Sequence, residues 1–510
     1  MKGMKRIPQE EIEEKDKKGN NDYIYDKIYP QFPSIKKLGY ITLVIIILIL
    51  AKNKLNILIF RNSSTNLNST NTSNKSNENT QQEDSEEDKK SKVRLALYVH
   101  SLNVNEMEKL TTILINHMSK QRIFDIYLFI NKDCKNEFKI NKTVHRIKIN
   151  IHSTQVLRRK LIDYKIEMFL YQFYSINDMK MLNQIADKNN IRTLIIGHTS
   201  FLSWIYNKDF NFFSKLYNFY KQTKYIVSSV AYESDLLHKK WGINSIFMNN
   251  IMPYEYNNIT PSDLSSKTIL MVGKGSNKLK RFDLGIKAMK YIVKEIPDCE
   301  MKIISDFEGL GDLKLLTKEL NLENNIKFEE YTSSNDIYYK NASLHLLTSV
   351  SESDGLILCE TKLFGIPNIL TGLDYLTCSK NGTVTIYNDN PENIAQEAIK
   401  ILKDEKYKKN LGKKARESMK QFDNNVIADK WLRLILSVYL DDSYYERIKD
   451  EDKELINKKE NMNNLKTQVN LLKMRIDEMK SVTVDDIMNF DYMKKLYKLK
   501  KDNNYFKGFF

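Results

Sequence analysis

The sequence Ser-Val-Ser-Glu-Ser-Asp-Gly-Leu-Ile-Leu-Cys-Glu-Thr-Lys-Leu-Phe-Gly-Ile-Pro, residues 349–367, places two glutamates, Glu352 and Glu360, eight positions apart. An apolar run, residues 343–347, precedes this stretch, and a helical pattern follows that ends at the Gly-Ile-Pro sequence. The pattern predicts a strand, a loop and a helix. Carboxylates at the carboxyl end of such a strand can accept hydrogen bonds from ligand hydroxyls. Spacing alone favours two exposed acids, and it is the surrounding segment that indicates a site.

Short β-rich runs alternate with helical periodicity between residues 93 and 435. The predicted strands are Val93–Val99, Phe124–Ile130, Ile191–Ile196, Tyr225–Ser229, Thr268–Val272, Met301–Ile304, Ile326–Glu329, Ser343–Leu347, Asn368–Thr371 and Thr383–Tyr387. Asn390-Pro-Glu predicts the start of a helix that ends near Leu402. Such alternation indicates parallel sheets with helices on both faces. Because the stretch is too long for one sheet, we predict an α/β protein with two Rossmann-like doubly wound domains, residues 93–255 and 256–435. Ligands of such folds bind at the carboxyl ends of the strands, here between the domains.

Four segments, in order along the chain, together resemble one family. They are Ile-Ile-Gly-His at 195–198, Met-Asn-Asn-Ile at 248–251, Met-Val-Gly-Lys-Gly-Ser-Asn-Lys-Leu-Lys-Arg-Phe-Asp at 271–283, and the E-x7-E motif of Glu352 and Glu360. In this order and spacing, residues 93–435 resemble glycosyltransferase family 4, the glycosyl transferases group 1. The resemblance implies a GT-B fold, in which residues 93–255 lie on the acceptor side and residues 256–435 bind a nucleotide sugar.

The resemblance also implies how the donor's diphosphate is held. Lys274 and Lys280 take the positions of the family's phosphate-binding cations, and backbone amides after Gly355 would face phosphate or sugar oxygens. Cations fixed there stabilise the departing nucleotide, so no metal and no other cofactor is implied. Arg281, where the family has Gly, could add another cation or cap a surface. The alternative for both lysines is a solvated basic loop.

The remaining roles come from the same resemblance. Glu360 would accept hydrogen bonds from the ribose hydroxyls of the nucleotide, and Glu352 would lie nearer the donor sugar. His198 would orient the sugar or the acceptor, with a core histidine as the alternative. The predicted catalytic residues are therefore Glu352, Lys280 and His198. The family retains anomeric configuration, and no protein nucleophile is assigned.

One departure from the family lies after the first predicted strand. The family has a glycine-rich loop there, whereas residues 102–109 read Leu-Asn-Val-Asn-Glu-Met-Glu-Lys. Glycine allows the closest approach of backbone to a ligand, so the donor half of the site is better supported than the acceptor half. Two hypotheses follow. The first is a retaining glycosyltransferase that acts on a glycan, a lipid-linked sugar or a protein; the second is an inactive scaffold that binds a glycan or nucleotide.

The N-terminal region carries a predicted membrane anchor. After a polar tail, residues 1–37, an apolar run from Leu38 to Ala51 is flanked by lysines. Its helix would span about 21 Å, and lysine side chains with residues 55–60 extend it toward the roughly 30 Å core of a bilayer. We therefore predict a single-pass anchor over residues 38–60. The sequence favours an anchor over a cleaved signal peptide, because no small-residue cleavage site follows the apolar run.

Residues 61–92 are polar and predict a disordered stem. Four sequons begin in it, at Asn62, Asn68, Asn71 and Asn74. Residues 17–37 hold five lysines, against three basic residues in 52–72, which favours a cytoplasmic N-terminus and a lumenal globular part over a cytosolic one. We predict an endomembrane location in preference to the plasma membrane.

The C-terminal tail, residues 436–510, is predicted to be helical. Apolar residues at seven-residue spacing over 448–479 indicate either a self-associating coiled coil or one helix packed on the enzyme. Lysines and aromatics are interleaved near the C-terminus, a pattern that is typical of segments that contact a membrane interface or an acidic partner. The alternative is a solvated tail without a partner.

Composition limits the partners of the chain. Its 510 residues carry 80 Lys and Arg against 65 Asp and Glu, a formal charge of +15. That surplus could serve nucleic acid, a membrane surface or phosphorylated small molecules. No zinc-type spacing and no nucleic-acid module is present, so we predict no nucleic-acid partner. The four cysteines have no disulfide-framework spacing.

Overall fold

The computed structural model describes residues 92–440, apart from 103–105, 122, 135–136, 151–152, 173–175, 199–209, 240, 274–276, 307–309 and 333–334. The predicted anchor, the heptads of the tail and Lys274 therefore lie outside the described residues. Within the described part of the chain, no helix is both long and apolar enough to cross a membrane.

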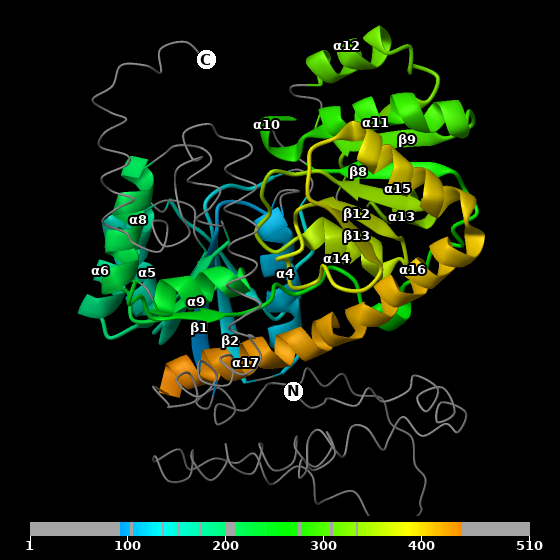
Figure 1. The fold of residues 1–510 in the computed structure, drawn as a ribbon. Helices are drawn as coiled ribbons and strands as arrows, with labels where there is room; N and C mark the ends of the chain where they lie inside the picture. Colours follow the sequence, from blue (N-terminus) through cyan, green and yellow to red (C-terminus); the bar gives the residue numbers. More distant parts are fainter. Residues whose placement is uncertain are drawn as a thin grey trace, which may run out of the picture. The chain divides into compact units, whose positions relative to one another are not determined.

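The first domain, coloured blue to green in Figure 1, is built on a seven-stranded parallel sheet with the order β3-β2-β1-β4-β5-β6-β7. Its strands are β1 (Val93–Val99), β2 (Phe124–Ile130), β3 (His145–Lys148), β4 (Met168–Gln172), β5 (Arg192–Gly197), β6 (Ile226–Ser228) and β7 (Ser245–Phe247). Its helices are α4 (Glu106–Ser119), α5 (Thr154–Asp163), α6 (Ile176–Lys188), α8 (Phe210–Gln222) and α9 (Ala231–Lys239). The four strands predicted for this domain are confirmed, whereas β3, β4 and β7 were not predicted.

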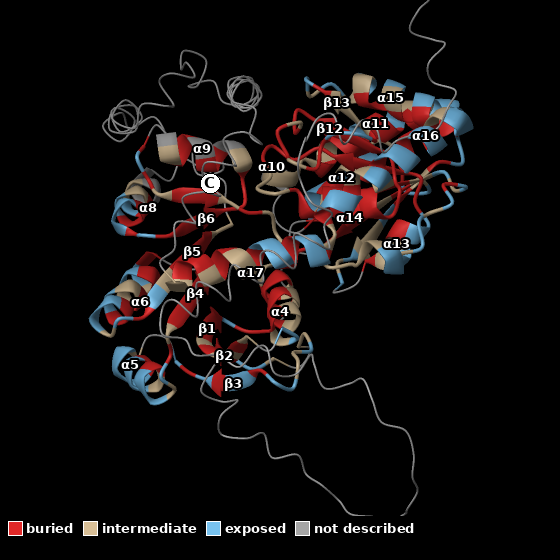
Figure 2. Cartoon of the chain, turned by 90° about the horizontal axis from the view of Figure 1, so that it is seen from below, coloured by how far each residue is buried: buried red, intermediate tan, exposed pale blue. Residues whose placement is uncertain are grey.

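Alternate residues of β1 enter two different cores, as the period of two in a strand requires. Leu95 and Leu97 belong to a core that also contains Leu114 of α4. Ala96 and Tyr98 belong to the opposite core, which contains residues of α5 and α6. Figure 2 shows that the strands of this sheet are mostly buried, apart from the edge strand β3, and that α5 and α6 have exposed outer faces. The domain therefore has the doubly wound arrangement predicted from the sequence.

The second domain repeats this plan with a six-stranded parallel sheet of order β10-β9-β8-β11-β12-β13. Its strands are β8 (Thr268–Val272), β9 (Glu300–Ser305), β10 (Ile326–Glu330), β11 (Leu344–Leu347), β12 (Asn368–Thr371) and β13 (Thr383–Ile386). Its helices are α10 (Asn277–Lys280), α11 (Phe282–Glu295), α12 (Gly311–Glu319), α13 (Asp336–Lys340), α14 (Leu356–Leu363), α15 (Pro391–Lys403) and α16 (Glu405–Ser418). All six predicted strands are present. The predicted cap of α15 is also confirmed, since the Asn390 side chain accepts a hydrogen bond from the Glu392 amide at 2.8 Å.

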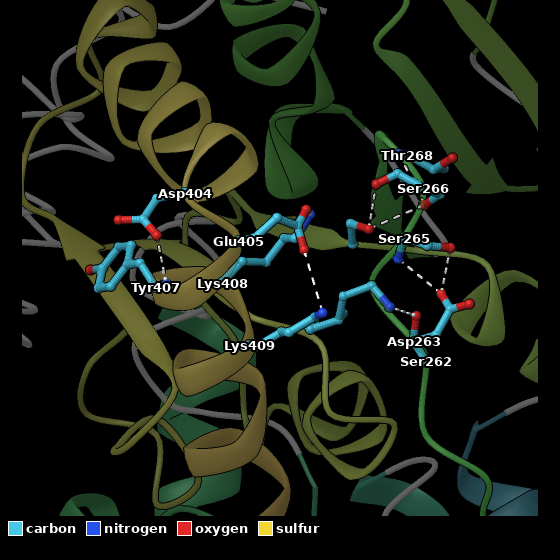
Figure 3. Close-up of polar contacts among 12 residues, drawn as sticks. Ser262, Asp263, Ser265, Ser266, Thr268, Asp404, Glu405, Tyr407, Lys408 and Lys409 are labelled. Atoms are coloured by element: carbon cyan, nitrogen blue, oxygen red, sulfur yellow. Dashed lines mark hydrogen bonds and ion pairs between the residues drawn. The ribbon is translucent and has the colours of Figure 1, made fainter.

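The segment that joins the domains is fixed to α16. The Arg416 guanidinium donates hydrogen bonds to the carbonyls of Leu363, Tyr256 and Ile259 at 2.5, 3.0 and 2.8 Å. Figure 3 shows the next part of the joint, where the Asp263 carboxylate accepts from the amide and hydroxyl of Ser265, near Lys409. These contacts order the entry into β8.

The last described helix, α17 (Asn424–Leu440), returns to the first domain. Ile427, Trp431 and Leu434 are buried in the same core as β1 and α4. The Trp431 indole donates a hydrogen bond to the carbonyl of Asn249 at 2.9 Å. The prediction that residues up to 435 belong to the second domain did not anticipate this return. Helix α17 therefore links the two halves a second time.

Candidate active site

The stretch that opened the sequence analysis forms the predicted strand, loop and helix. β11 ends at Leu347, and α14 begins after Gly355, which has φ of 70° and ψ of 43°. This left-handed conformation is strained for residues with a side chain. A Cβ added at Gly355 would also lie 2.8 Å from Cδ1 of Leu376. Gly355 therefore lets the loop turn sharply from the carboxyl end of the sheet into α14.

Lys280 and Glu352 meet on this loop. The Nζ atom of Lys280 lies 2.7 Å from Oε1 of Glu352, and their side chains are 15% and 17% exposed. The absence of a side chain at Gly273 leaves space for the aliphatic part of Lys280, because a Cβ at Gly273 would lie only 3.2 Å from Cδ of Lys280. Two residues predicted to be catalytic, 72 positions apart, are thus in direct contact.

The backbone of Glu352 is held by Tyr375. The amide of Glu352 donates to the tyrosine hydroxyl at 2.8 Å, and that hydroxyl donates to the carbonyl of Glu352 at 2.5 Å. Burial raises the pKa of Tyr375, so its hydroxyl stays protonated and can donate at neutral pH. Sequence reasoning missed Tyr375, which stands in no motif.

Glu360 lies on α14 and is buried, with a side chain that is 1% exposed. Its Oε1 atom lies 3.2 Å from Nζ of Lys109, on α4 of the first domain. Its Oε2 atom accepts a hydrogen bond from the Tyr339 hydroxyl at 2.6 Å. Burial, followed by the negative charge of Glu360, raises the pKa of Tyr339. Glu360, which was predicted to bind the ribose, therefore already has two donors from the protein, Lys109 and Tyr339.

The Asn-containing link between the domains reaches the same loop. The Asn250 amide donates a hydrogen bond to Oδ2 of Asp354, two residues after Glu352. Burial raises the pKa of Asp354 despite this bond. The neighbouring Asn249 amide donates to the hydroxyl of Thr377 at 3.3 Å. The predicted Met-Asn-Asn-Ile segment thus positions the loop that carries Glu352.

His198 follows the last residue of β5, at the carboxyl edge of the first sheet. Burial lowers the pKa of His198 to about 4, so the imidazole is neutral at pH 7. Its Nε2 atom is buried and has no hydrogen-bond partner among the described residues. The same is true of Oε1 of Gln172, at the end of β4, and of Oγ of Ser229, just after β6. Three adjacent strands thus end in polar atoms that a ligand could bind.

A buried carboxylate, that of Glu233 on α9, lies near two tyrosines around the site. Burial raises the pKa values of Tyr220 and Tyr375, and the negative charge of Glu233 on α9 adds to both shifts. The hydroxyl of Tyr220 would lie 2.7 Å from a Cβ at Gly197, the residue before His198. Glu233 is therefore close both to the tyrosine beside Gly197 and to the tyrosine that holds the backbone of Glu352.

Arg281 has a different surrounding from Lys280. Its backbone is left-handed, with φ of 53°, and precedes α11. Its guanidinium contacts the carboxylates of Asp283 at 3.3 Å and Asp389 at 3.0 Å. Of the two roles left open by the sequence, these contacts support the structural one.

Two doubly wound domains of parallel strands are the arrangement of the GT-B fold. Residues 255–418 match the family model of the glycosyl transferases group 1, so the predicted resemblance is confirmed and the chain carries a glycosyltransferase domain of this group.

The individual relatives share less than a third of their aligned residues with this chain. The chain is 26% identical over 214 residues to an uncharacterized glycosyltransferase of Haemophilus influenzae, a match that covers 40% of this chain and 59% of the relative. It is 29% identical over 182 residues to the N-acetyl-α-D-glucosaminyl L-malate synthase of Bacillus anthracis, covering 35% of this chain and 47% of that enzyme. The chain thus spans about half the length of these relatives.

Among solved structures, the Anabaena protein HepE in complex with UDP and glucose superposes with a TM-score of 0.55. The two sequences are 12% identical, and the superposition covers 68% of this chain and 100% of HepE. This likeness supports the GT-B fold of the described residues.

Proposed function

We propose that the protein transfers a sugar from a nucleotide-sugar donor to a hydroxyl of an acceptor. The observation that carries this proposal is the pair that Lys280 forms with Glu352, on the loop that leads from the carboxyl end of β11 into α14, the helix that carries Glu360. All three residues lie within the segment that matches the glycosyl transferases group 1. HepE, which shares the fold, was crystallised with UDP and glucose.

The proposed chemistry centres on the departing diphosphate. The bond between the anomeric carbon of the sugar and the diphosphate oxygen breaks, and a bond to the acceptor oxygen forms as the acceptor hydroxyl passes its proton to the departing diphosphate. Negative charge grows on the diphosphate during this step. Lys280, together with Lys274, would stabilise that charge, so the reaction proposed here needs no metal cofactor. Retention of anomeric configuration is part of the proposal.

The first domain would supply the other side of the site. The neutral imidazole of His198, with Gln172 and Ser229, offers buried polar atoms suited to sugar or acceptor hydroxyls. The acceptor class we propose is a glycan, a lipid-linked sugar or a protein.

The discriminating experiment measures donor hydrolysis and transfer by the full chain across UDP-, GDP- and ADP-sugars. Lys280→Ala and Glu352→Ala should each lower turnover at least 100-fold, since both remove a group that faces the donor. Lys403→Ala is the matched control, because Lys403 pairs with Glu295 on an exposed surface. Absence of both binding and turnover with every donor would overturn the proposal.

A second candidate is a scaffold that binds a nucleotide or glycan without turnover. The observation that favours it is Glu360, whose two oxygens are both engaged and whose side chain is 1% exposed. Residues 102–109 also lack the family's glycines. Saturable nucleotide binding without turnover would select this candidate.

We also propose that residues 38–60 anchor the protein in an endomembrane with the globular part in the lumen. The flanking lysines and the sequons of residues 61–92 support this topology. Endoglycosidase treatment of the expressed protein tests it. A mobility shift is expected, and its absence in variants with intact sequons would contradict the lumenal orientation.

A further inference from the structure

The contacts of Glu360 raise a question that the proposed function leaves open. A nucleotide's ribose has two neighbouring hydroxyls that a carboxylate can accept, but this carboxylate is 1% exposed. Its Oε1 atom faces Lys109 at 3.2 Å and its Oε2 atom faces Tyr339 at 2.6 Å. A ribose can reach Glu360 only if one of these two side chains moves.

Lys109 is the side chain that can move. Tyr339 is fully buried and lies on α13, within the same domain as Glu360. Lys109 is 14% exposed and comes from α4 of the first domain, 251 positions away in sequence. Its Nζ atom also lies 5.4 Å from the ring centre of Tyr254, in the segment between the domains. A flexible lysine held by contacts across a domain boundary is displaced more easily than a buried tyrosine ring.

Charge compensation explains why a lysine faces the buried carboxylate of Glu360. A buried carboxylate that has lost its partners is costly, because it has lost its hydration. Lys109 supplies a positive charge to Glu360 in place of water. A ribose diol can take over this role, since two hydroxyls donate two hydrogen bonds to one carboxylate.

We propose that Lys109 determines specificity for the nucleotide, because its bond to Glu360 is exchanged for the ribose diol when a nucleotide binds. This inference rests on the proposed function, in which Glu360 holds the ribose. Only a nucleotide with both hydroxyls compensates Glu360 after Lys109 has left. The exchange therefore makes binding depend on the 2′,3′-diol, and the bond that has to be broken lowers the affinity for a ribonucleotide.

The position of Lys109 fits this role. It ends the segment, residues 102–109, that stands where the family has a glycine-rich loop. The first domain thus contacts the nucleotide-binding carboxylate with a charged side chain of α4. Release of Lys109 would also remove one contact between the domains, so nucleotide binding and domain arrangement become coupled.

The test measures dissociation constants by titration calorimetry with the full chain. The probes are UDP, GDP and ADP, each beside its 2′,3′-dideoxy analogue. In Lys109→Met there is no bond between residue 109 and Glu360 to break. Whichever of the three ribonucleotides the protein binds should therefore bind to this variant about tenfold more tightly than to the wild type, which corresponds to about 1.4 kcal/mol. The dideoxy analogue should change less than threefold, since it cannot compensate Glu360.

Two variants make the result specific. Lys280→Met should weaken a ribonucleotide and its dideoxy analogue alike, because it acts on the diphosphate. Lys403→Met removes an exposed lysine from a surface pair and should leave both constants unchanged. Thermal unfolding of each variant identifies any that fail to fold, and Lys109→Arg, which keeps the charge, should behave as the wild type does.

The outcomes separate the inference from the proposed function. Equal changes for both members of a nucleotide pair in Lys109→Met, or weaker ribonucleotide binding, would overturn the exchange while leaving a nucleotide site in place. Binding by Lys109→Met but not by the wild type would support it strongly. If neither protein binds any nucleotide, the proposed function fails and the exchange fails with it.

Discussion

Replacing Gly355 with alanine should damage the donor loop far more than the same change at another helix start. Gly355 has a left-handed backbone, which costs a residue with a Cβ about 1–2 kcal/mol. The new Cβ would lie 2.8 Å from Cδ1 of Leu376, which is 3% exposed and has little room to move. Overpacking of this kind costs about 1–3 kcal/mol.

Gly311 is the matched control. It is the first residue of α12, its backbone φ is not in the left-handed region, and a Cβ there meets no atom within 4 Å. Gly311→Ala should therefore be neutral or stabilising by up to about 1 kcal/mol, because alanine favours helix. Gly355→Ala should be destabilising by about 2–5 kcal/mol when strain and overpacking are taken together.

Urea denaturation followed by tryptophan fluorescence measures the free energy of unfolding of both variants. Nucleotide binding at low temperature, where both are folded, adds a functional measurement. Gly355→Ala should bind the nucleotide more weakly, since Glu352 and Gly355 share one loop, and Gly311→Ala should bind it as the wild type does. Equal stability and equal affinity of the two variants would refute the role given to Gly355.

Three further changes test the fold around the site. His345 is fully buried and burial lowers its pKa to about 4, so between pH 6.5 and 4 the unfolded chain binds more protons and stability falls as pH falls. His345→Leu should remove up to about 3 kcal/mol of this loss between pH 7 and 4; an unchanged pH dependence of urea unfolding would contradict it. Arg416→Lys should cost about 1.5–3 kcal/mol, because a lysine ammonium is too compact to reach all three carbonyls that the wide, planar guanidinium spans. Thermal unfolding measures this cost, and the exposed control Lys414→Met should be neutral. Trp431→Ala should cost about 3–5 kcal/mol by chemical denaturation, against almost nothing for exposed Val426→Ala on the same helix; similar costs would mean that α17 does not hold the first domain.

The sequence predicted ten strands of the two sheets because most of them are short runs of β-branched and other apolar residues. It missed three strands for physical reasons. Three of the four residues of β3 are exposed at an edge of the sheet, so no alternation marks it. β7 has only three residues. β4, Met168–Gln172, is buried on both faces, and such a run cannot be distinguished from a buried helix by periodicity.

The site was predictable as far as its residues share a motif. Lys280 and Glu352 could both be assigned to the donor site, because each stands in a segment that resembles a motif of the family. Lys109, Tyr339 and Tyr375 carry no local pattern, and only the fold brings them to the two glutamates. The return of α17 to the first domain was hidden for the same reason, since its apolar periodicity does not say which core it enters.

The position of a bound nucleotide tests the central claim most directly. A crystal structure of the protein with UDP or a UDP-sugar should place the diphosphate within hydrogen-bond distance of Nζ of Lys280, at the carboxyl end of the second sheet, with the ribose at Glu360. A nucleotide bound elsewhere, or a diphosphate that does not contact Lys280, would contradict the account.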